Sequence, residues 1–216
     1  MSLGKTAMTG EVKLRLGEEI ANAITHGIGA ALAIAGFVVL ILFSEGHEIL
    51  SYSIYGVALV MLYLASTLYH SLVFTRVGKL FRKFDHMAIF LLIAGTYTPF
   101  CLHVLHGWLS WVLLGTVWLL ATAGIVLKAM FTGRFEWLST AIYILTGWLV
   151  IFAIKPIYQS LPLQSFVLLI AGGLAYTIGT AFYVKSKIPY FHMVWHLWVL
   201  AGSILHFFSI LTLTEL

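Results

Sequence analysis

Residues 108–127 read WLSWVLLGTVWLLATAGIVL, a run of twenty residues without a single charged side chain. A membrane-spanning α-helix needs about 20 predominantly apolar residues to cross the hydrocarbon core of a bilayer. The run is continuous, whereas the strands of a membrane β-barrel alternate polar and apolar residues. This stretch therefore predicts a transmembrane helix and excludes a porin-type barrel.

Similar apolar runs, separated by short polar or Gly/Pro-bearing turns, fill most of the chain. They predict the spans 22–44, 50–74, 85–105, 108–130, 137–154, 163–184 and 192–213. The expected fold is all-α, a seven-transmembrane helical bundle. It forms one membrane domain, residues 19–216, preceded by a cytosolic N-terminal lead, residues 1–18.

The composition of the 216-residue chain agrees with this fold and excludes a soluble domain. Hydrophobic residues make up 61% and charged residues 9%, against about 45–50% and about 25% in ordinary soluble domains. The first 18 residues contain no apolar segment with a cleavage site, so a secretory signal peptide is not expected. The single cysteine, Cys101, cannot form an internal disulfide and is expected to be a small buried residue.

The basic residues are unevenly distributed between the two ends of the predicted spans. Eleven of the twelve Lys and Arg fall in or beside the N-terminal lead and the second, fourth and sixth loops, and only Lys155 falls on the opposite side. Because cytosolic loops carry the excess of Lys and Arg, the N-terminus is predicted to be cytosolic and the C-terminus outside. The net charge of +4 then reflects orientation and contact with membrane lipids, and no nucleic acid is needed as a partner. The expected location is the cell (inner or plasma) membrane.

Ionisable residues inside membrane spans are rare and usually functional. In the predicted orientation, His70 lies near the cytosolic end of the second span, one turn after Ser66. Asp85, His192 and His196 lie at the cytosolic starts of the third and seventh spans. Residues that are far apart in the sequence are thus predicted to meet at one depth.

The spacing of these residues suggests a metal site. His192 and His196, four residues apart, share one helical face and can offer two imidazoles to one ion. His70 would complete a three-histidine set, and a catalytic zinc ion commonly has three protein ligands and one open position. The glutamate of an HExxH sequence is missing, because residues 193–195 are Met, Val and Trp, so Asp85 would have to serve as the base.

Structural roles are open for each of these residues taken alone. Asp85 would be stabilised at a helix N-terminus by the helix dipole, and Ser66 can bond the carbonyl four residues earlier. His86 lies about 100° around the helix from Asp85, so the two side chains should point apart, and an interfacial or supporting role is expected for His86. His206 should hydrogen-bond a neighbouring helix. Surface positions near the outer face are expected for His47, His103 and His106.

Five segments of the chain, taken in order, form a recognisable pattern. They are Glu19-Ile-Ala-Asn22-Ala-Ile-Thr25-His26, Ser66-Thr-Leu-Tyr-His70, Phe84-Asp85-His86, Gly95-Thr-Tyr-Thr-Pro99-Phe and His192-Met-Val-Trp-His196. Together they resemble the bacterial hemolysin III family. That family is the prokaryotic branch of the progestin and adiponectin receptor proteins, within a group of membrane hydrolases that includes alkaline ceramidases.

The resemblance implies a seven-helix bundle with one zinc ion per chain near the cytosolic face. Matched residue by residue, the metal-binding histidines of the family fall on His70, His192 and His196. The family's aspartate, which holds the zinc-bound water in the receptor branch, falls on Asp85, and its serine falls on Ser66. The first-span signature, for which structural or supporting roles are expected, falls on Glu19, Asn22 and His26.

The predicted function is metal-dependent hydrolysis of a lipid-like amide or ester. Zinc would activate water and polarise a carbonyl group, Asp85 would accept the proton, and Ser66 would hydrogen-bond the developing oxyanion. The substrate would enter between helices or from the cytosolic leaflet.

Two alternatives of other classes stay open. One is a membrane-active hemolysin or cytolysin, although seven charge-poor spans suit a resident membrane protein better than a secreted toxin. The other is a receptor or sensor of membrane homeostasis, in which zinc ties the second, third and seventh helices together. A retinal protein is excluded, because residues 192–213 contain no lysine for a Schiff base. The oligomeric state is not predicted.

Overall fold

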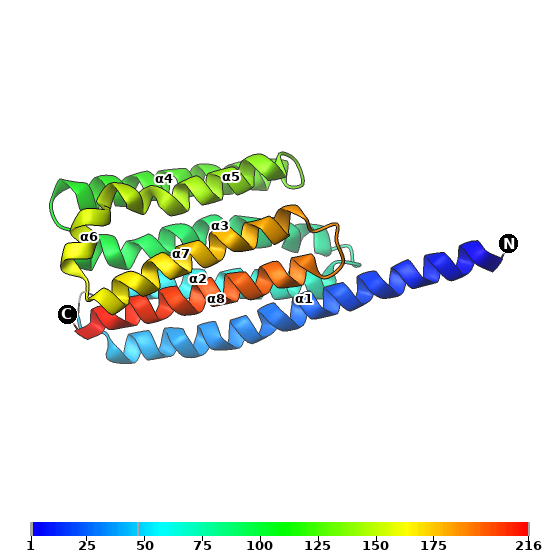
Figure 1. The fold of residues 1–216 in the computed structure, drawn as a ribbon, viewed down its shortest axis with the longest axis horizontal. Helices are drawn as coiled ribbons and strands as arrows, with labels where there is room; N and C mark the ends of the chain where they lie inside the picture. Colours follow the sequence, from blue (N-terminus) through cyan, green and yellow to red (C-terminus); the bar gives the residue numbers. More distant parts are fainter. Residues whose placement is uncertain (1, 47, 216) are drawn as a thin grey trace.

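The computed structural model describes residues 2–46 and 48–215, so His47 lies outside the described residues. Seven helices in this part are long and apolar enough to cross a membrane, and successive ones run in opposite directions through one elongated bundle (Figure 1). The described residues form helices and turns without any β-strand. The predicted all-α, seven-helix fold is confirmed.

The helices follow the chain in a simple order. They are α1 (Ser2–Phe43), α2 (Glu48–Leu72), α3 (Gly78–Pro99), η1 (Phe100–Val104), α4 (Trp108–Phe131), α5 (Glu136–Gly147), η2 (Trp148–Ala153), α6 (Ile154–Ser160), α7 (Leu163–Val184), α8 (Phe191–Leu211) and η3 (Thr212–Glu215). The third span continues into η1, a π-helical turn directly after Pro99, which has no N–H to donate. The fifth span is composite and consists of α5, the 3₁₀ turn η2 and α6.

The segment predicted as an N-terminal lead is helical, and its assignment as a lead stays a prediction. α1 begins at Ser2, and residues 2–18 form one continuous helix with the first span. This part of α1 projects beyond the bundle (Figure 1). Apolar periodicity reports burial against other helices, so it gives no signal for a helix that extends past its neighbours.

Two further boundaries differ from the predicted spans. α3 begins at Gly78, so Arg82 and Lys83, expected in a loop, are helical, and Asp85 lies about two turns inside the helix. The helix dipole acts mainly within the first turn, so it does not explain the position of Asp85. Lys155, expected in a turn, lies in α6.

The two ends of the bundle have different connections. One end, here called the basic end, carries the connections 73–77, 132–135 and 185–190, and the C-terminus lies at the other end (Figure 1). At the basic end, Tyr190 adopts a left-handed conformation with φ of 62° just before α8. Its backbone N–H donates to Glu18 Oε1 at 2.7 Å. This bond fixes the start of α8 against α1, next to His192.

A close approach of α1 to α2 builds the wall of the site. A Cβ atom at Gly29 would lie 2.4 Å from Cδ1 of Tyr63, so only glycine fits there. Tyr63 is fully buried, and its hydroxyl donates to Ser203 Oγ of α8 at 2.8 Å. One tyrosine thus joins the three helices that carry the candidate site.

Candidate metal centre

The structure brings together His70 from the end of α2 and His192 and His196 from the start of α8. Each offers one ligand atom, and these atoms all lie within 4.8 Å of one another. The ring centroids are 4.7 Å apart for His192 and His196, and 4.9 Å apart for His70 and His196. Ligand nitrogens lie about 2.0–2.1 Å from a zinc ion, so small side-chain movements suffice to surround one.

His70 has the partner that a metal-binding histidine usually has. Its Nδ1 lies 2.6 Å from Oε2 of Glu19, while its Nε2 is buried and has no hydrogen-bond partner among the described residues. Metal-binding histidines commonly donate their second ring N–H to a carboxylate or carbonyl, which fixes the tautomer. The Glu19 carboxylate accepts a hydrogen bond from Nδ1–H, and the Nε2 lone pair is left for a metal.

His196 is supported in the same way by α1. Its Nδ1 lies 3.3 Å from the backbone oxygen of Asn22 and 3.3 Å from Thr25 Oγ1. The Thr25 hydroxyl already donates to the carbonyl of Ala21 at 2.9 Å, so it can accept from His196. With Nδ1 as the donor, Nε2 of His196 is free to bind a metal. The donor set of three buried or half-buried imidazoles with these partners fits zinc.

The first-span signature lies against the histidine set. Glu19 contacts His70, and Asn22 contacts His196 through its carbonyl. The ring of His26 stacks on His196, with centroids 3.5 Å apart and planes at 14°. The supporting roles expected for these residues stay predictions, and each of the three residues contacts a histidine that it could support.

Ser66 is buried one turn from His70, with 1% of its surface exposed. Its Oγ has no hydrogen-bond partner among the described residues. The alternative in which Ser66 bonds a carbonyl of its own helix is therefore not found. A buried hydroxyl without a partner is available to a bound molecule.

Asp85 lies outside the set of ligand atoms but close to it. Its carboxylate interacts electrostatically with His70 and His26. Asp85 Oδ2 also lies 3.3 Å from Nδ1 of His86, a buried residue. The expectation that these two side chains point apart is wrong, because rotation about their side-chain bonds overcomes the angular offset along the helix.

Sequence reasoning missed a charged cluster beside the site. Glu136, the first residue of α5, accepts from Lys128 Nζ at 2.8 Å and from the Tyr183 hydroxyl at 3.3 Å. Arg82 Nη2 and His86 Nε2 lie 3.6 and 3.8 Å from its other oxygen. Lys128 is only 2% exposed. Lys128 and Glu136 lie on either side of one short loop at the basic end, and this placement is a signal for an ion pair. From the sequence, the charges there predicted only the orientation of the protein in the membrane.

The other histidines lie away from the set. His206 contacts the Leu169 carbonyl of α7 through Nε2 at 3.0 Å, as expected for a bond between helices. His103, expected at the surface, is half-buried, and its Nε2 lies 2.6 Å from Ser51 Oγ. His106 is exposed and Cys101 is buried, as expected.

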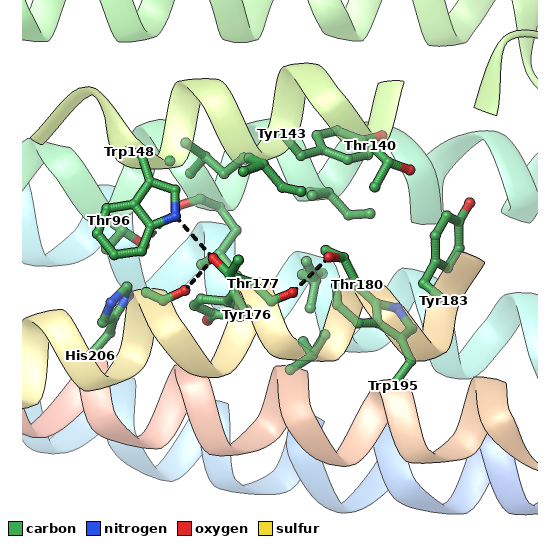
Figure 2. Close-up of a pocket in the computed structure, with 18 of the residues that line it drawn as sticks. Thr96, Thr140, Tyr143, Trp148, Tyr176, Thr177, Thr180, Tyr183, Trp195 and His206 are labelled. Carbon is green, nitrogen blue, oxygen red and sulfur yellow. Dashed lines mark hydrogen bonds between the residues drawn. The ribbon is translucent and has the colours of Figure 1, made fainter. Parts of the chain in front are cut away.

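One of two neighbouring cavities borders the histidine set. A polar cavity of about 450 Å³, here called the vestibule, lies at the basic end and includes His70, His192 and Glu136 in its wall. An apolar cavity of about 130 Å³, here called the chamber, lies deeper, with walls from α3, α5, α7 and α8 (Figure 2). Thr140 and Tyr183 border both cavities. The polar cavity that borders His70 and His192 and the apolar cavity deeper in the bundle therefore share part of their walls.

The fold and this site define a class: seven-helix membrane proteins with three histidines gathered between their second and last spans. The chain matches the family model described as Haemolysin-III related over residues 14–207. It belongs to the haemolysin III family, as the sequence motifs implied.

Individual relatives cover nearly the whole chain. It is 50% identical over 210 residues to Hemolysin-3 of Bacillus cereus, which covers 95% of this chain and 94% of that protein. It is 50% identical over 198 residues to the Hemolysin-3 homolog of Bacillus subtilis (strain 168), covering 90% of this chain and 93% of that protein. It is 27% identical over 204 residues to the human Monocyte to macrophage differentiation factor, covering 89% and 83% respectively.

Proposed function

We propose that this integral membrane protein is a zinc-dependent hydrolase of a lipid-like amide or ester, located in the cell membrane with its basic end toward the cytosol. The compact set of His70, His192 and His196 supports this function most directly, because their ligand atoms lie within 4.8 Å of one another. Oxygen atoms of Glu19 and Asn22 on α1 contact Nδ1 of His70 and His196 and leave Nε2 of both rings for a metal. Such a set with an open fourth position is typical of catalytic zinc sites.

The residues around the set have complementary roles in hydrolysis. Zinc held by three neutral imidazoles supplies a positive charge that activates water and polarises a carbonyl group. Asp85 accepts the proton of the attacking water, and His86, 3.3 Å from its carboxylate, holds it in place. Ser66 donates its unpartnered hydroxyl to the carbonyl oxygen of the substrate.

The two cavities favour an amphiphilic substrate. The chamber is lined mainly by apolar and aromatic side chains, among them Tyr143, Trp148 and Trp195 (Figure 2). The vestibule is lined by charged and polar groups, including Arg82 and Glu136. An acyl chain in the chamber and a polar headgroup in the vestibule would bring the bond between them close to the histidines.

Metal content and turnover test this function together. We expect about one zinc ion per purified chain, and loss of most of it in His196→Ala, since a three-ligand site does not survive removal of one ligand. Asp85→Asn should keep its zinc but hydrolyse a fluorogenic long-chain acyl amide or ester about 10²–10⁴-fold more slowly, because a general base is lost. A wild-type protein without zinc, or an Asp85→Asn variant with full turnover, would contradict the function.

A second function, membrane lysis, is favoured by the names of the two Bacillus relatives. Purified wild-type protein and Asp85→Asn would be compared for lysis of erythrocytes and liposomes. Loss of lysis in the variant would make lysis a consequence of the hydrolytic site. Equal lysis by both proteins would assign it to a separate property of the bundle.

A further inference from the structure

One histidine touches the ligand set without belonging to it. His26 of α1 is 4% exposed and lies between two rings: His196, stacked on it at 3.5 Å, and Tyr63, edge-on at 5.0 Å. Both of its ring nitrogens are buried and have no hydrogen-bond partner among the described residues. Buried polar groups are almost always hydrogen-bonded, so an unpartnered one calls for a functional explanation.

Packing alone does not explain a histidine at this position. An aromatic hydrocarbon ring would fill the space between Tyr63 and His196 without two buried nitrogens that lack partners. A neutral imidazole has one N–H donor and one acceptor nitrogen. His26 therefore holds a donor next to the candidate metal centre, and the described residues leave that donor unused.

A second unused donor lies at the same level on the neighbouring helix. Ser66 follows Tyr63 by three residues on α2, and its hydroxyl is also buried without a partner. The ring of His26 contacts Tyr63 of α2 at 5.0 Å, and residues three apart lie on one face of a helix, so Ser66 lies one turn from this contact. His26 and Ser66 are thus placed on neighbouring turns of α1 and α2, with His196 against one and His70 one turn from the other.

We propose that His26 and Ser66 together form an oxyanion pocket, in which the neutral His26 N–H and the Ser66 hydroxyl donate to the oxygen of the reacting carbonyl group. This inference rests on the proposed hydrolytic function. The parallel stack keeps the edge of the His26 ring within a few ångströms of the edge of His196. Donors aimed at the position where negative charge develops are usually the largest single contribution to acyl-transfer catalysis.

Binding of an oxyanion-bearing probe tests this pocket without relying on turnover. The probe is octanohydroxamic acid, titrated calorimetrically into the zinc-loaded full chain in detergent. His26→Phe keeps a ring for the stack but removes both nitrogens, and it should keep about one zinc per chain. Its affinity for the hydroxamate should fall about 10- to 100-fold, as expected for the loss of a hydrogen bond to a charged oxygen.

Matched variants separate the hydrogen bond from packing. Ser165→Ala, at the end of the bundle opposite the histidine set, removes a buried hydroxyl that bonds the Ser209 carbonyl and should bind the probe like the wild type. His26→Gln, which keeps an N–H donor, should bind the hydroxamate more tightly than His26→Leu. If His26→Phe does not fold, the affinities of these two variants test whether residue 26 donates a hydrogen bond, and equal affinities would overturn the pocket.

The outcomes that overturn the pocket differ from those that overturn the function. A His26→Phe variant with full zinc and wild-type hydroxamate affinity would show that His26 only fills space between its neighbours. A His26→Phe variant that loses its zinc would make His26 only a support of His196. A wild-type protein without zinc would instead overturn the proposed function, and this inference with it.

Discussion

At the scale of single residues, the candidate metal centre depends on groups that are not ligands. Glu19 fixes His70 at 2.6 Å, and the Asn22 carbonyl and Thr25 hydroxyl fix His196 at 3.3 Å. These partners hold each ring in one tautomer and one orientation. The first helix therefore shapes the site although it contributes none of the three histidines.

Glu19→Gln tests this support. The amide oxygen can still accept a hydrogen bond from His70 but lacks the negative charge, so zinc affinity should fall about 10- to 100-fold. Competition with a chelating dye measures the affinity. Glu18→Gln is the matched control, because its amide oxygen can still accept the Tyr190 N–H and no ligand contact is changed. Equal affinities of Glu19→Gln and the wild type would show that the carboxylate has no role in holding the metal.

The sequence predicted the ligand set by depth, but not which residue of the first helix contacts which histidine. The distribution of Lys and Arg assigned His70, His192 and His196 to one end of the bundle, and the structure brings them together. The rotation of α1 about its own axis decides that Glu19 meets His70, and α1 has apolar residues on both buried and exposed faces. Weak periodicity in such a helix leaves its rotation undetermined.

At the scale of elements, glycines decide how closely the helices approach. Gly29→Val would place new atoms on the Tyr63 ring, since even a Cβ would lie 2.4 Å from it. We expect a loss of about 1–3 kcal/mol in the free energy of unfolding, as in other overpacked cores. Titration with SDS in mixed micelles measures this loss.

Gly115→Ala is the control for the glycine prediction. A Cβ at Gly115 of α4 would meet no atom within 4 Å, so this variant should be as stable as the wild type, or more stable by up to about 1 kcal/mol. Equal stability of Gly29→Val and Gly115→Ala would contradict the close contact between α1 and α2.

The cluster around Glu136 joins α3, α4, α5 and α7. It predicts which of two substitutions lowers the free energy of unfolding more. Glu136→Leu leaves Lys128 buried, with no ion-pair partner among the described residues, and should lower the free energy of unfolding by on the order of 3 kcal/mol. Lys128→Met should cost less, because Glu136 keeps Arg82 and Tyr183. The same SDS titration measures both variants, and the reverse order would contradict the assignment of this pair.

Helix boundaries were the least predictable part of the elements. The apolar runs located all seven spans, but they placed the start of the third at residue 85, whereas α3 begins at Gly78. Polar residues such as Arg82 and Lys83 are good helix formers, so a helix continues past the apolar run wherever no Pro or unfavourable turn stops it. The same reason explains why residues 11–16 of α1, which are Glu, Val, Lys, Leu, Arg and Leu, continue the helix.

At the scale of the whole molecule, the bundle has a basic end that contains the histidine set and a second end with the C-terminus (Figure 1). Orientation in the membrane follows from the charges and is tested by labelling. In a Cys101→Ala background, a cysteine at His106 should react with an impermeant maleimide on intact cells. A cysteine at Lys187 should react only after lysis. Both positions are exposed, and the opposite pattern would invert the predicted orientation.

The whole molecule joins a polar vestibule, an apolar chamber and three histidines, and bound zinc is the central claim about it. X-ray absorption at the zinc edge of the purified protein tests that claim most directly. We predict three imidazole nitrogens and one oxygen donor at about 2.0–2.2 Å. A spectrum without zinc, or one with fewer than three imidazoles around the metal, would contradict the assignment of His70, His192 and His196.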